Sequence, residues 1–304
     1  MNLIILPYLD CPAYTEAAIQ DCVAQSIGAV TLLLIDNGSQ DAGRLVGETA
    51  ARTHPRVYRW WHNPPAPSLA GIWNRALQFA WESGVQQVLV VNNDVRLHPD
   101  TYAVLSEARM NTGAWFISGV GVLEGQFDPT INLRDALGTV TEARKDGVRP
   151  EGYSYGGPDF SCFLITRECH RWFQFDEGFV PAYFEDNDFH RRLQLAGFGD
   201  KIFGVNVPFL HYGSGTLKGN ARLREGWPPR FAACQQYYVE KWGGLPGSET
   251  FQYPFNALTL DEAASEDGDP RRFYTGQGKP GYTLGAATDP SWIDLFNGQT
   301  TREP

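Results

Sequence analysis

Short apolar segments alternate with amphipathic segments over residues 3–122, and this order constrains the fold more strongly than any other feature of the chain. The pattern predicts strands at 3–9, 31–35, 56–61, 86–91 and 114–122. It predicts helices at 15–27, with Thr15 as N-cap, and at 40–53, 69–83 and 99–110. A strict strand–helix alternation implies a mostly parallel central sheet with helices on both faces. The predicted fold class is therefore α/β.

The alternation ends at residue 122, and residues 123–158 are rich in Gly, Pro and charge, which indicates an irregular insertion. After this insertion the pattern predicts a strand at 160–166, a helix at 182–196, a strand at 201–207 and a helix ending near residue 242. From residue 245 onward the chain has nine acidic and four basic residues and little periodicity. We expect this last segment to be an acidic, partly irregular extension.

Composition and charge disfavour several classes of protein. Lys and Arg number 25 and Asp and Glu 35 among 304 residues, and the resulting charge of −10 argues against a large polyanion as the main partner. No apolar run approaches the ~20 residues of a membrane helix, and the first residues lack the basic start of a signal peptide. The five cysteines form no C-x-x-C pair, so we expect reduced thiols and a soluble, cytoplasmic protein.

Polar residues follow the predicted strand at 86–91, at the edge where α/β sheets bind ligands. Asn92, Asn93 and Asp94 could simply end the strand and cap the helix near residue 99. Alternatively, Asp94 could hold Mg²⁺ or Mn²⁺ against a diphosphate, because these ions bind one or two carboxylates together with phosphate oxygens. The residues alone leave both interpretations open.

A turn, Asp36-Asn37-Gly38-Ser39, follows the predicted strand at 31–35. It could cap the next helix, or Asp36 could accept a hydrogen bond from the base or ribose of a nucleotide. The sequence contains neither G-x-G-x-x-G nor G-x-x-x-x-G-K-[ST], so it supports neither a dinucleotide fingerprint nor a P-loop.

Three acidic residues, Glu185, Asp186 and Asp188, crowd the first turn of the helix predicted at 182–196. Acids at this position complement the helix dipole, at about 0.3–1 kcal/mol each, but one acid would suffice for that purpose. Neighbouring carboxylates repel one another, which raises the pKa of one of them and makes it a candidate general base.

His211 follows the last predicted strand and precedes a loop rich in Gly and Ser. A single histidine in such a position is commonly structural, but it could also bind a metal ion or a phosphate. A local group of basic residues comes next and indicates either an anionic ligand or a solvated helix face. The group comprises Lys218, Arg222, Arg224 and Arg230.

Taken together, these segments resemble glycosyltransferases of the GT-A fold, and most closely family 2, the inverting group that uses nucleotide sugars. The segment 34–41 (LIDNGSQD) is similar to the family's D-N-x-S-x-D turn, and 91–95 to its DXD-type motif. Asn63 and the segment 71–76 resemble its N-x-G…N-x-A pattern. The segment 184–197 (FEDNDFHRRLQLAG) resembles its E-D-x-D helix, and 241–243 its K-W-G. These motifs stand in the family's order within residues 1–244.

The resemblance implies a nucleotide-binding half at 1–122, an acceptor-binding half at 123–244 and an extension at 245–304. It implies Mg²⁺ or Mn²⁺ bound by Asp94, with His211 as a second ligand or a phosphate contact. The first acid of the DXD motif is Asn92 here, so we expect weak metal binding until the nucleotide arrives. The donor would be a nucleoside-diphosphate sugar, expected to be UDP-linked, bound by Pro7, Tyr8, Asp36, Asn63, Asn74 and Asn93.

In the other half, the resemblance makes Asp186 the general base, with Glu185 as the alternative, and gives acceptor or phosphate contacts to Lys218, Arg222 and Arg224. The expected acceptor is a hydroxyl on a glycan, with a hydroxymethylated pyrimidine in DNA as the alternative. Two other classes of function stay open. A nucleotidyltransferase would need a Gly-rich basic loop, which residues 7–14 lack, and a non-catalytic sugar-binding module would need no acid cluster at 185–188.

Overall fold

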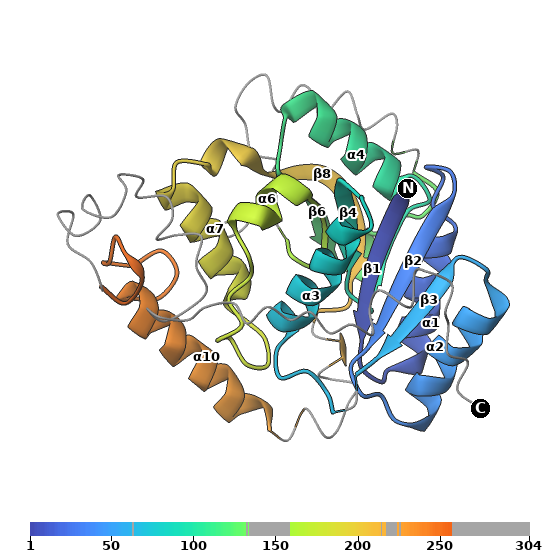
Figure 1. The fold of residues 1–304 in the computed structure, drawn as a ribbon, viewed down its shortest axis with the longest axis horizontal. Helices are drawn as coiled ribbons and strands as arrows, with labels where there is room; N and C mark the ends of the chain where they lie inside the picture. The colour runs from blue at the N-terminus through green and yellow to red at the C-terminus, as the bar shows by residue number, and fades with distance from the viewer. Residues whose placement is uncertain are drawn as a thin grey trace.

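The structure is a computed structural model that describes residues 1–62, 64–131, 133, 159–213, 215–216, 224 and 226–256. One eight-stranded sheet forms its centre, with the strand order β3-β2-β1-β4-β7-β6-β8-β5 (Figure 1). The strands are β1 (Asn2–Tyr8), β2 (Val30–Asp36), β3 (Val57–Trp61), β4 (Gln87–Val91), β5 (Val95–Arg96), β6 (Phe116–Val122), β7 (Cys162–Thr166) and β8 (Ile202–His211).

The sheet is mostly parallel. β1 pairs in parallel with β2 and β4, β2 with β3, and β6 with β8. β7 lies between β4 and β6 and is antiparallel to both, while the short β5 is antiparallel to β8. Since β4 and β6 both oppose β7, strands β1, β2, β3, β4, β6 and β8 all run in one direction. The predicted α/β class and the predicted mostly parallel sheet are thus confirmed.

Helices cover both faces of the sheet (Figure 1). Successive residues of β1 point to opposite faces, as a strand requires. Ile5 packs in a core with Trp73 and Phe189, whereas Ile4 packs in a second core with Tyr102. The helices are α1 (Pro12–Val23), α2 (Asp41–Thr53), α3 (Leu69–Glu82), α4 (Thr101–Thr112), α6 (Arg167–Trp172), α7 (Glu185–Leu195) and α10 (Trp227–Trp242), with 3₁₀ turns at Glu124–Gln126, Gly199–Lys201 and Pro254–Asn256.

Several predicted boundaries were wrong, for identifiable reasons. α1 begins at Pro12 with Cys11 as N-cap, because proline is well suited to a first helical turn, and Thr15 instead donates a hydrogen bond to the Asp10 carbonyl at 3.1 Å. α7 begins three residues later than predicted, because Tyr183 and Phe184 have φ values of 88° and 70° that a right-handed helix excludes.

Two predicted regions lie largely outside the described residues, namely the insertion at 123–158 and the extension at 245–304. The described start of the extension folds back onto α10, where the Trp242 carbonyl accepts hydrogen bonds from the Thr250 and Phe251 N–H groups at 3.1 and 3.0 Å. Within the described residues, no helix combines the length and apolar character needed to cross a membrane.

Candidate active site

The topology brings the polar residues to one edge of the sheet. Strands β1, β2, β4, β6 and β8 run in the same direction, so their carboxyl ends share this edge. β7 runs the other way, so residues just before it, Asp159 and Ser161, reach the same edge. In open α/β sheets ligands bind at such an edge.

Asp94 and His211 form a pair there. β5 pairs with β8 so that Val95 lies opposite His211, which places the preceding Asp94 beside the histidine. His211 Nε2 lies 3.6 Å from Asp94 Oδ2, and the same oxygen accepts a hydrogen bond from the Gly215 N–H at 2.7 Å. Burial raises the pKa of Asp94, but His211 and the Gly215 amide outweigh that effect and hold the pKa below its ordinary value. The Asp94 carboxylate is therefore ionised near neutral pH.

Asn93 holds the loop after β8 against α1. Its Oδ1 accepts a hydrogen bond from Thr216 Oγ1 at 2.7 Å, and its Nδ2 donates to Thr15 Oγ1 at 3.0 Å. Gly215 sits so close that a Cβ there would lie 3.0 Å from the Asp94 Cβ. Asn93 is buried, and its contacts fix the position of the loop that carries Gly215.

Asp36 lies in a buried cluster at the carboxyl end of β2. Its Oδ2 accepts hydrogen bonds from the Tyr8 hydroxyl at 2.9 Å and from Arg59 at 2.7 Å, and its Oδ1 accepts from the Ser39 N–H at 2.8 Å. Burial and the Asp36 charge raise the pKa of Tyr8, so this hydroxyl keeps its proton and donates it to Asp36. Position 47 leaves space only for glycine, because a Cβ there would overlap the Tyr8 hydroxyl. Pro7, next to Tyr8 in β1, is also buried.

Glu185 and Asp186 begin α7, and they differ in surroundings. Glu185 is 6% exposed, its Oε2 has no hydrogen-bond partner among the described residues, and burial and the Asp186 charge raise its pKa to about 8. Asp186 is half-buried, and its Oδ1 accepts a hydrogen bond from the Asn187 N–H at 2.8 Å. Burial also raises the pKa of Asp186. Burial is the largest cause of both shifts, and repulsion from nearby carboxylates adds to it.

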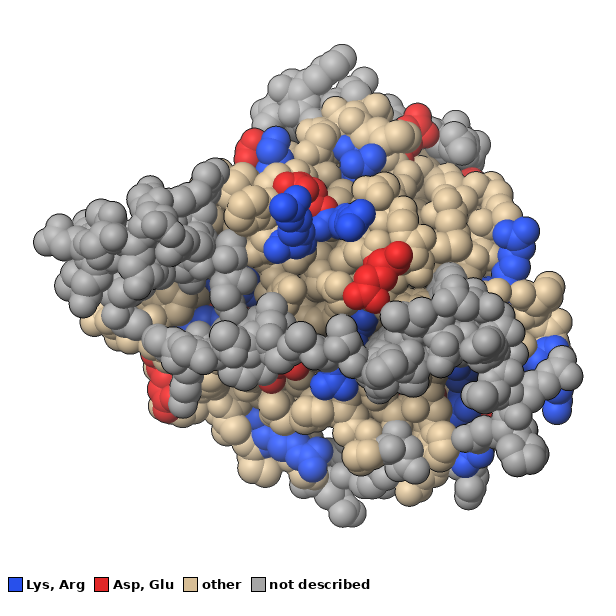
Figure 2. All heavy atoms as spheres, viewed as in Figure 1, with Lys and Arg blue, Asp and Glu red and all other residues tan. Residues whose placement is uncertain are grey.

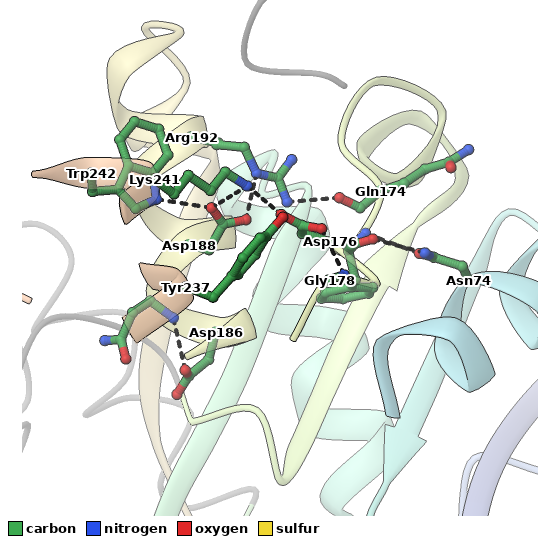
Figure 3. Close-up of polar contacts among 12 residues, drawn as sticks. Asn74, Gln174, Asp176, Gly178, Asp186, Asp188, Arg192, Tyr237, Lys241 and Trp242 are labelled. Carbon is green, nitrogen blue, oxygen red and sulfur yellow. Dashed lines mark hydrogen bonds and ion pairs between the residues drawn. The ribbon is translucent and has the colours of Figure 1, made fainter. Parts of the chain in front are cut away.

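Asp188, the third acid, belongs to a buried ion cluster (Figure 3). Its carboxylate accepts hydrogen bonds from Arg192 Nε at 2.8 Å and Trp242 Nε1 at 2.9 Å, and lies 2.7 Å from Lys241 Nζ. Lys241 also donates to Asp176 Oδ2 at 2.5 Å. Burial raises the pKa of Asp188, but Lys241 and Arg192 overcome this and lower it. Figure 3 shows Asp186 pointing away from this cluster.

Asp159 connects the Asp94–His211 pair with the acids of α7. Its Oδ2 lies 4.0 Å from His211 Nδ1, and its negative charge is one of the causes of the raised pKa of Asp186. Asp94, His211 and Asp159 therefore form one group at this edge, and the charge of Asp159 acts on Asp186 as well.

Asn74 acts as a clamp between α3 and the segment after α6. Its Nδ2 donates to the Phe175 carbonyl at 2.8 Å, and its Oδ1 accepts from the Phe175 N–H at 2.9 Å. Nδ2 also donates to Glu177 Oε1 at 3.0 Å, and Oδ1 lies 3.2 Å from His170 Nε2. Because Trp81 donates to His170 Nδ1 at 3.0 Å, the neutral histidine carries its proton on Nε2 and donates to Asn74. These contacts give Asn74 a positioning role.

Three residues predicted for the site lie outside the described part of the chain: Asn63, Lys218 and Arg222. Arg224 is described and is exposed. Of the other predicted residues, Asp94 and His211 form a pair at the carboxyl edge of the sheet and Glu185 and Asp186 begin α7. The side chains of Tyr8, Asp36, Asn74 and Asn93 are engaged in hydrogen bonds within the protein.

Sequence reasoning missed Arg59, Asp159 and Asp176. Arg59 lies opposite Leu34 in the strand pairing, and an arginine in an otherwise apolar strand signals a buried acidic partner. Asp159 and Asp176 lie in irregular segments that carry no periodic signal, so only the folded chain brings them to His211 and Lys241.

The donor set at Asp94 fits a hard divalent cation in part. Asp94 offers a carboxylate and His211 an imidazole nitrogen, and the Asn92 Oδ1 is buried with no hydrogen-bond partner among the described residues. In that same part of the chain, no group of three or more His, Cys, Asp or Glu side chains could hold a metal ion alone. Mg²⁺ commonly uses one or two carboxylates and completes its shell with water and substrate phosphates. The residues therefore fit a cation that binds together with a diphosphate.

Comparison with solved structures finds this architecture in a glycosyltransferase. The mannosyltransferase PcManGT from Pyrobaculum calidifontis, in complex with GDP-Man and Mn2+, matches with a TM-score of 0.50 at 16% sequence identity. The match covers 76% of this chain and 60% of the mannosyltransferase. The fold is GT-A. At this level of identity the likeness concerns the GT-A fold alone.

Two further GT-A structures have lower scores. Glucosyl-3-phosphoglycerate synthase from Mycobacterium tuberculosis, in complex with Mn2+, UDP and glucosyl-3-phosphoglycerate, is 16% identical, with 77% of this chain and 80% of that chain covered and a TM-score of 0.48. S. aureus TarS is 14% identical, and the match covers 71% of this chain and 37% of TarS with a TM-score of 0.48. Neither a family model nor a curated protein matches the sequence.

Proposed function

We propose that the protein is a metal-dependent, inverting glycosyltransferase that moves a sugar from a nucleoside diphosphate to an acceptor hydroxyl. The observation that carries the proposal is the Asp94–His211 pair at the ligand-binding edge of a GT-A fold, with Asp159 4.0 Å from His211 and its charge acting on Asp186. The mannosyltransferase of the same fold was solved with GDP-Man and Mn2+, which supports a nucleotide-sugar donor and a divalent cation here.

The donor would lie over the carboxyl ends of β1, β2 and β4. The cluster of Tyr8, Asp36 and Arg59 would form the floor beneath the base and ribose, with the Arg59 side chain 13% exposed. Asn93 would keep the loop around Gly215 in place beside the diphosphate. We propose a UDP-linked sugar as donor, as the sequence resemblance implies.

Asp94 and His211 would hold Mg²⁺ or Mn²⁺ together with the diphosphate. The bound cation supplies positive charge that stabilises the leaving diphosphate. Asp94 is suited to this task because its pKa is low, so the carboxylate keeps its charge at neutral pH.

Asp186 would act as the general base. The acceptor hydroxyl gives its proton to the Asp186 carboxylate, its oxygen bonds to the anomeric carbon, and the bond from that carbon to the diphosphate oxygen breaks. A single displacement of this kind inverts the anomeric centre. Asp186 is a better base than Glu185 because it is more exposed and points away from the ion cluster, whereas Glu185 is buried and holds a proton below about pH 8 (Figure 3).

The acceptor would lie over the start of α7. Tyr183, Trp227 and Phe231 are half-buried and pack against one another just before α7, with the Tyr183 and Trp227 ring centroids 4.3 Å apart. Aromatic rings of this kind pack well against the apolar faces of sugars. This surface suits the proposed glycan acceptor, and because bases also stack on aromatic rings, the acceptor assays must separate a glycan from a base in DNA.

A panel of nucleotide sugars tests the proposal, with slow donor hydrolysis and transfer to simple glycosides as readouts. We expect one donor to be selected, turnover to stop in EDTA and return with Mn²⁺, and the product to have the inverted anomer. Asp186→Asn should lower turnover by roughly a hundredfold or more while donor binding persists, since general bases contribute about that factor.

Glu16→Gln is a suitable control because Glu16 is exposed on α1. The proposal would be overturned if the protein hydrolysed no donor in preference to the others, or if Asp186→Asn kept full turnover. Release of pyrophosphate instead of a nucleoside diphosphate would identify a nucleotidyltransferase.

A further inference from the structure

A pocket opens at the edge of the sheet opposite the candidate active site. It has a volume of about 580 Å³ and is formed where β4 and β6 begin and β7 ends, between the end of α4 and the short α6. We call it the distal pocket. Its lining includes Gln86, Arg109, Trp115, Thr166, Arg167 and Arg171.

The distal pocket concentrates positive charge that the protein leaves uncompensated. Within the described part of the chain, the side chains of Arg109, Arg167 and Arg171 make no salt bridge or hydrogen bond, and Arg109 Nε is buried without a partner. The one acid in the lining, Glu168, already accepts a hydrogen bond from Trp172 Nε1 at 2.9 Å. Three arginines and one glutamate give a charge of 3 − 1 = +2 in a chain of net charge −10.

Neighbouring guanidinium groups repel one another, so three of them at one pocket raise its free energy when it is empty. A bound anion would relieve this repulsion. Other arginines of this protein are matched by acids, as Arg59 is by Asp36 and Arg192 by Asp188. Figure 2 shows basic side chains gathered over α6 and beside α4 on the face that it draws.

The distal pocket is separate from the proposed reaction. β7 runs from Cys162, next to the Ser161 that contacts His211, to Thr166 in the distal pocket. Four residue steps along a strand span roughly 13 Å. The two sites therefore lie at opposite ends of the same strand, and a ligand in one does not touch the residues of the other.

We propose that the distal pocket binds a small phosphate-bearing molecule. The planar guanidinium fork matches phosphate oxygens in pairs, and arginine keeps its charge at any physiological pH. The volume falls within the range of about 300–1,000 Å³ that is typical of small-molecule sites. The half-buried Trp115 ring adds an apolar wall, which suits a phosphate carried on an organic group better than a free phosphate.

Titration calorimetry in EDTA at low ionic strength tests the proposal, with pyrophosphate and phenyl phosphate as separate probes. We expect one molecule of each probe to bind per chain. Arg167→Gln combined with Arg171→Gln should weaken binding roughly tenfold or more, because two charged hydrogen-bonding groups are removed. Trp115→Leu should weaken phenyl phosphate more than pyrophosphate, and equal weakening would assign the pocket to free phosphate species.

Two controls separate this proposal from the proposed function. Binding should persist in Asp94→Asn, since the chelator and this variant disable the candidate metal site alone. Arg52→Gln combined with Arg56→Gln removes two exposed arginines elsewhere and should leave binding unchanged. The proposal is overturned if the Arg167 and Arg171 variant binds like the wild type, if the Arg52 and Arg56 variant loses as much affinity, or if Asp94→Asn abolishes binding.

Discussion

Lys241 Nζ lies 2.7 Å from Asp188 Oδ1, and this contact fixes the first turn of the helix that carries Asp186. Lys241 is fully buried and joins Asp188 to Asp176, so two carboxylates share one ammonium group inside the protein. Trp242 Nε1 also donates a hydrogen bond to Asp188. The Lys-Trp-Gly motif near residue 242 is therefore a structural partner of the acidic motif at the start of α7.

We predict that Lys241→Met destabilises the protein by about 3–5 kcal/mol, because it removes the ammonium group that two buried carboxylates share. Urea denaturation measures this loss. Lys201→Met is the matched control: the Lys201 side chain is 33% exposed and forms a surface salt bridge with Asp200, so its loss should cost about 0.5 kcal/mol or less. Similar losses in both variants would contradict the buried-cluster interpretation.

The raised pKa of Glu185 predicts a pH-dependent stability. Between the ordinary carboxyl pKa of 4.5 and about 8, the folded protein keeps the Glu185 proton while the unfolded chain loses it. The contribution of Glu185 to the free energy of unfolding should therefore fall with rising pH, by about 1.4 kcal/mol per unit, and then level off.

Glu185→Gln should remove this dependence, so the difference between variant and wild type should grow in favour of the variant from pH 5 to pH 8. Urea denaturation at several pH values measures it. A constant difference over that range would show that Glu185 is ionised in the folded state. Glu16→Gln, on an exposed helix position, should run parallel to the wild type.

Asp94→Asn and His211→Ala should each weaken Mn²⁺ binding roughly tenfold or more in the presence of UDP, since the protein offers few ligands of its own. Without UDP we expect weak binding even in the wild type. Titration calorimetry with and without UDP measures both. Strong Mn²⁺ binding in the absence of nucleotide would contradict the idea that the diphosphate completes the metal site.

Asn74→Ala should destabilise the protein by about 2 kcal/mol or more, because it removes hydrogen bonds from the buried Phe175 N–H and carbonyl. Gln78→Ala on the same helix removes an exposed contact to Glu82 and should cost little. Urea denaturation and UDP titration are both informative. Unchanged stability with weakened UDP binding would instead show that Asn74 touches the nucleotide.

The sheet was predictable because its strands are short apolar runs separated by clear turn signals. β1 and β2 differ from the predicted ranges by one residue at each end. The short β5 was missed because two residues, Val95 and Arg96, have no detectable period. The sequence predicted β7 as a strand but not its antiparallel direction. That direction depends on the connection before β7, which has no periodic pattern of apolar residues.

The site was predictable where chemistry depends on local sequence and less so where it depends on folding. Asp94 follows a predicted strand and Asp186 lies in the first turn of a predicted helix, so local sequence motifs mark both as candidate site residues. Whether an acid faces a ligand or an internal cation is decided by distant partners. Asp186 and Asp188 stand two residues apart, yet of these two it is Asp188 that contacts Lys241, which follows it by more than fifty residues.

β6 and β7 are adjacent antiparallel strands, so the chain between them leaves and rejoins the sheet at the edge that carries the candidate site. A segment attached in this way can be lengthened, shortened or replaced without altering the order of any strand. Changes in that stretch of chain would leave the strand order intact and keep Asp159, just before β7, next to His211.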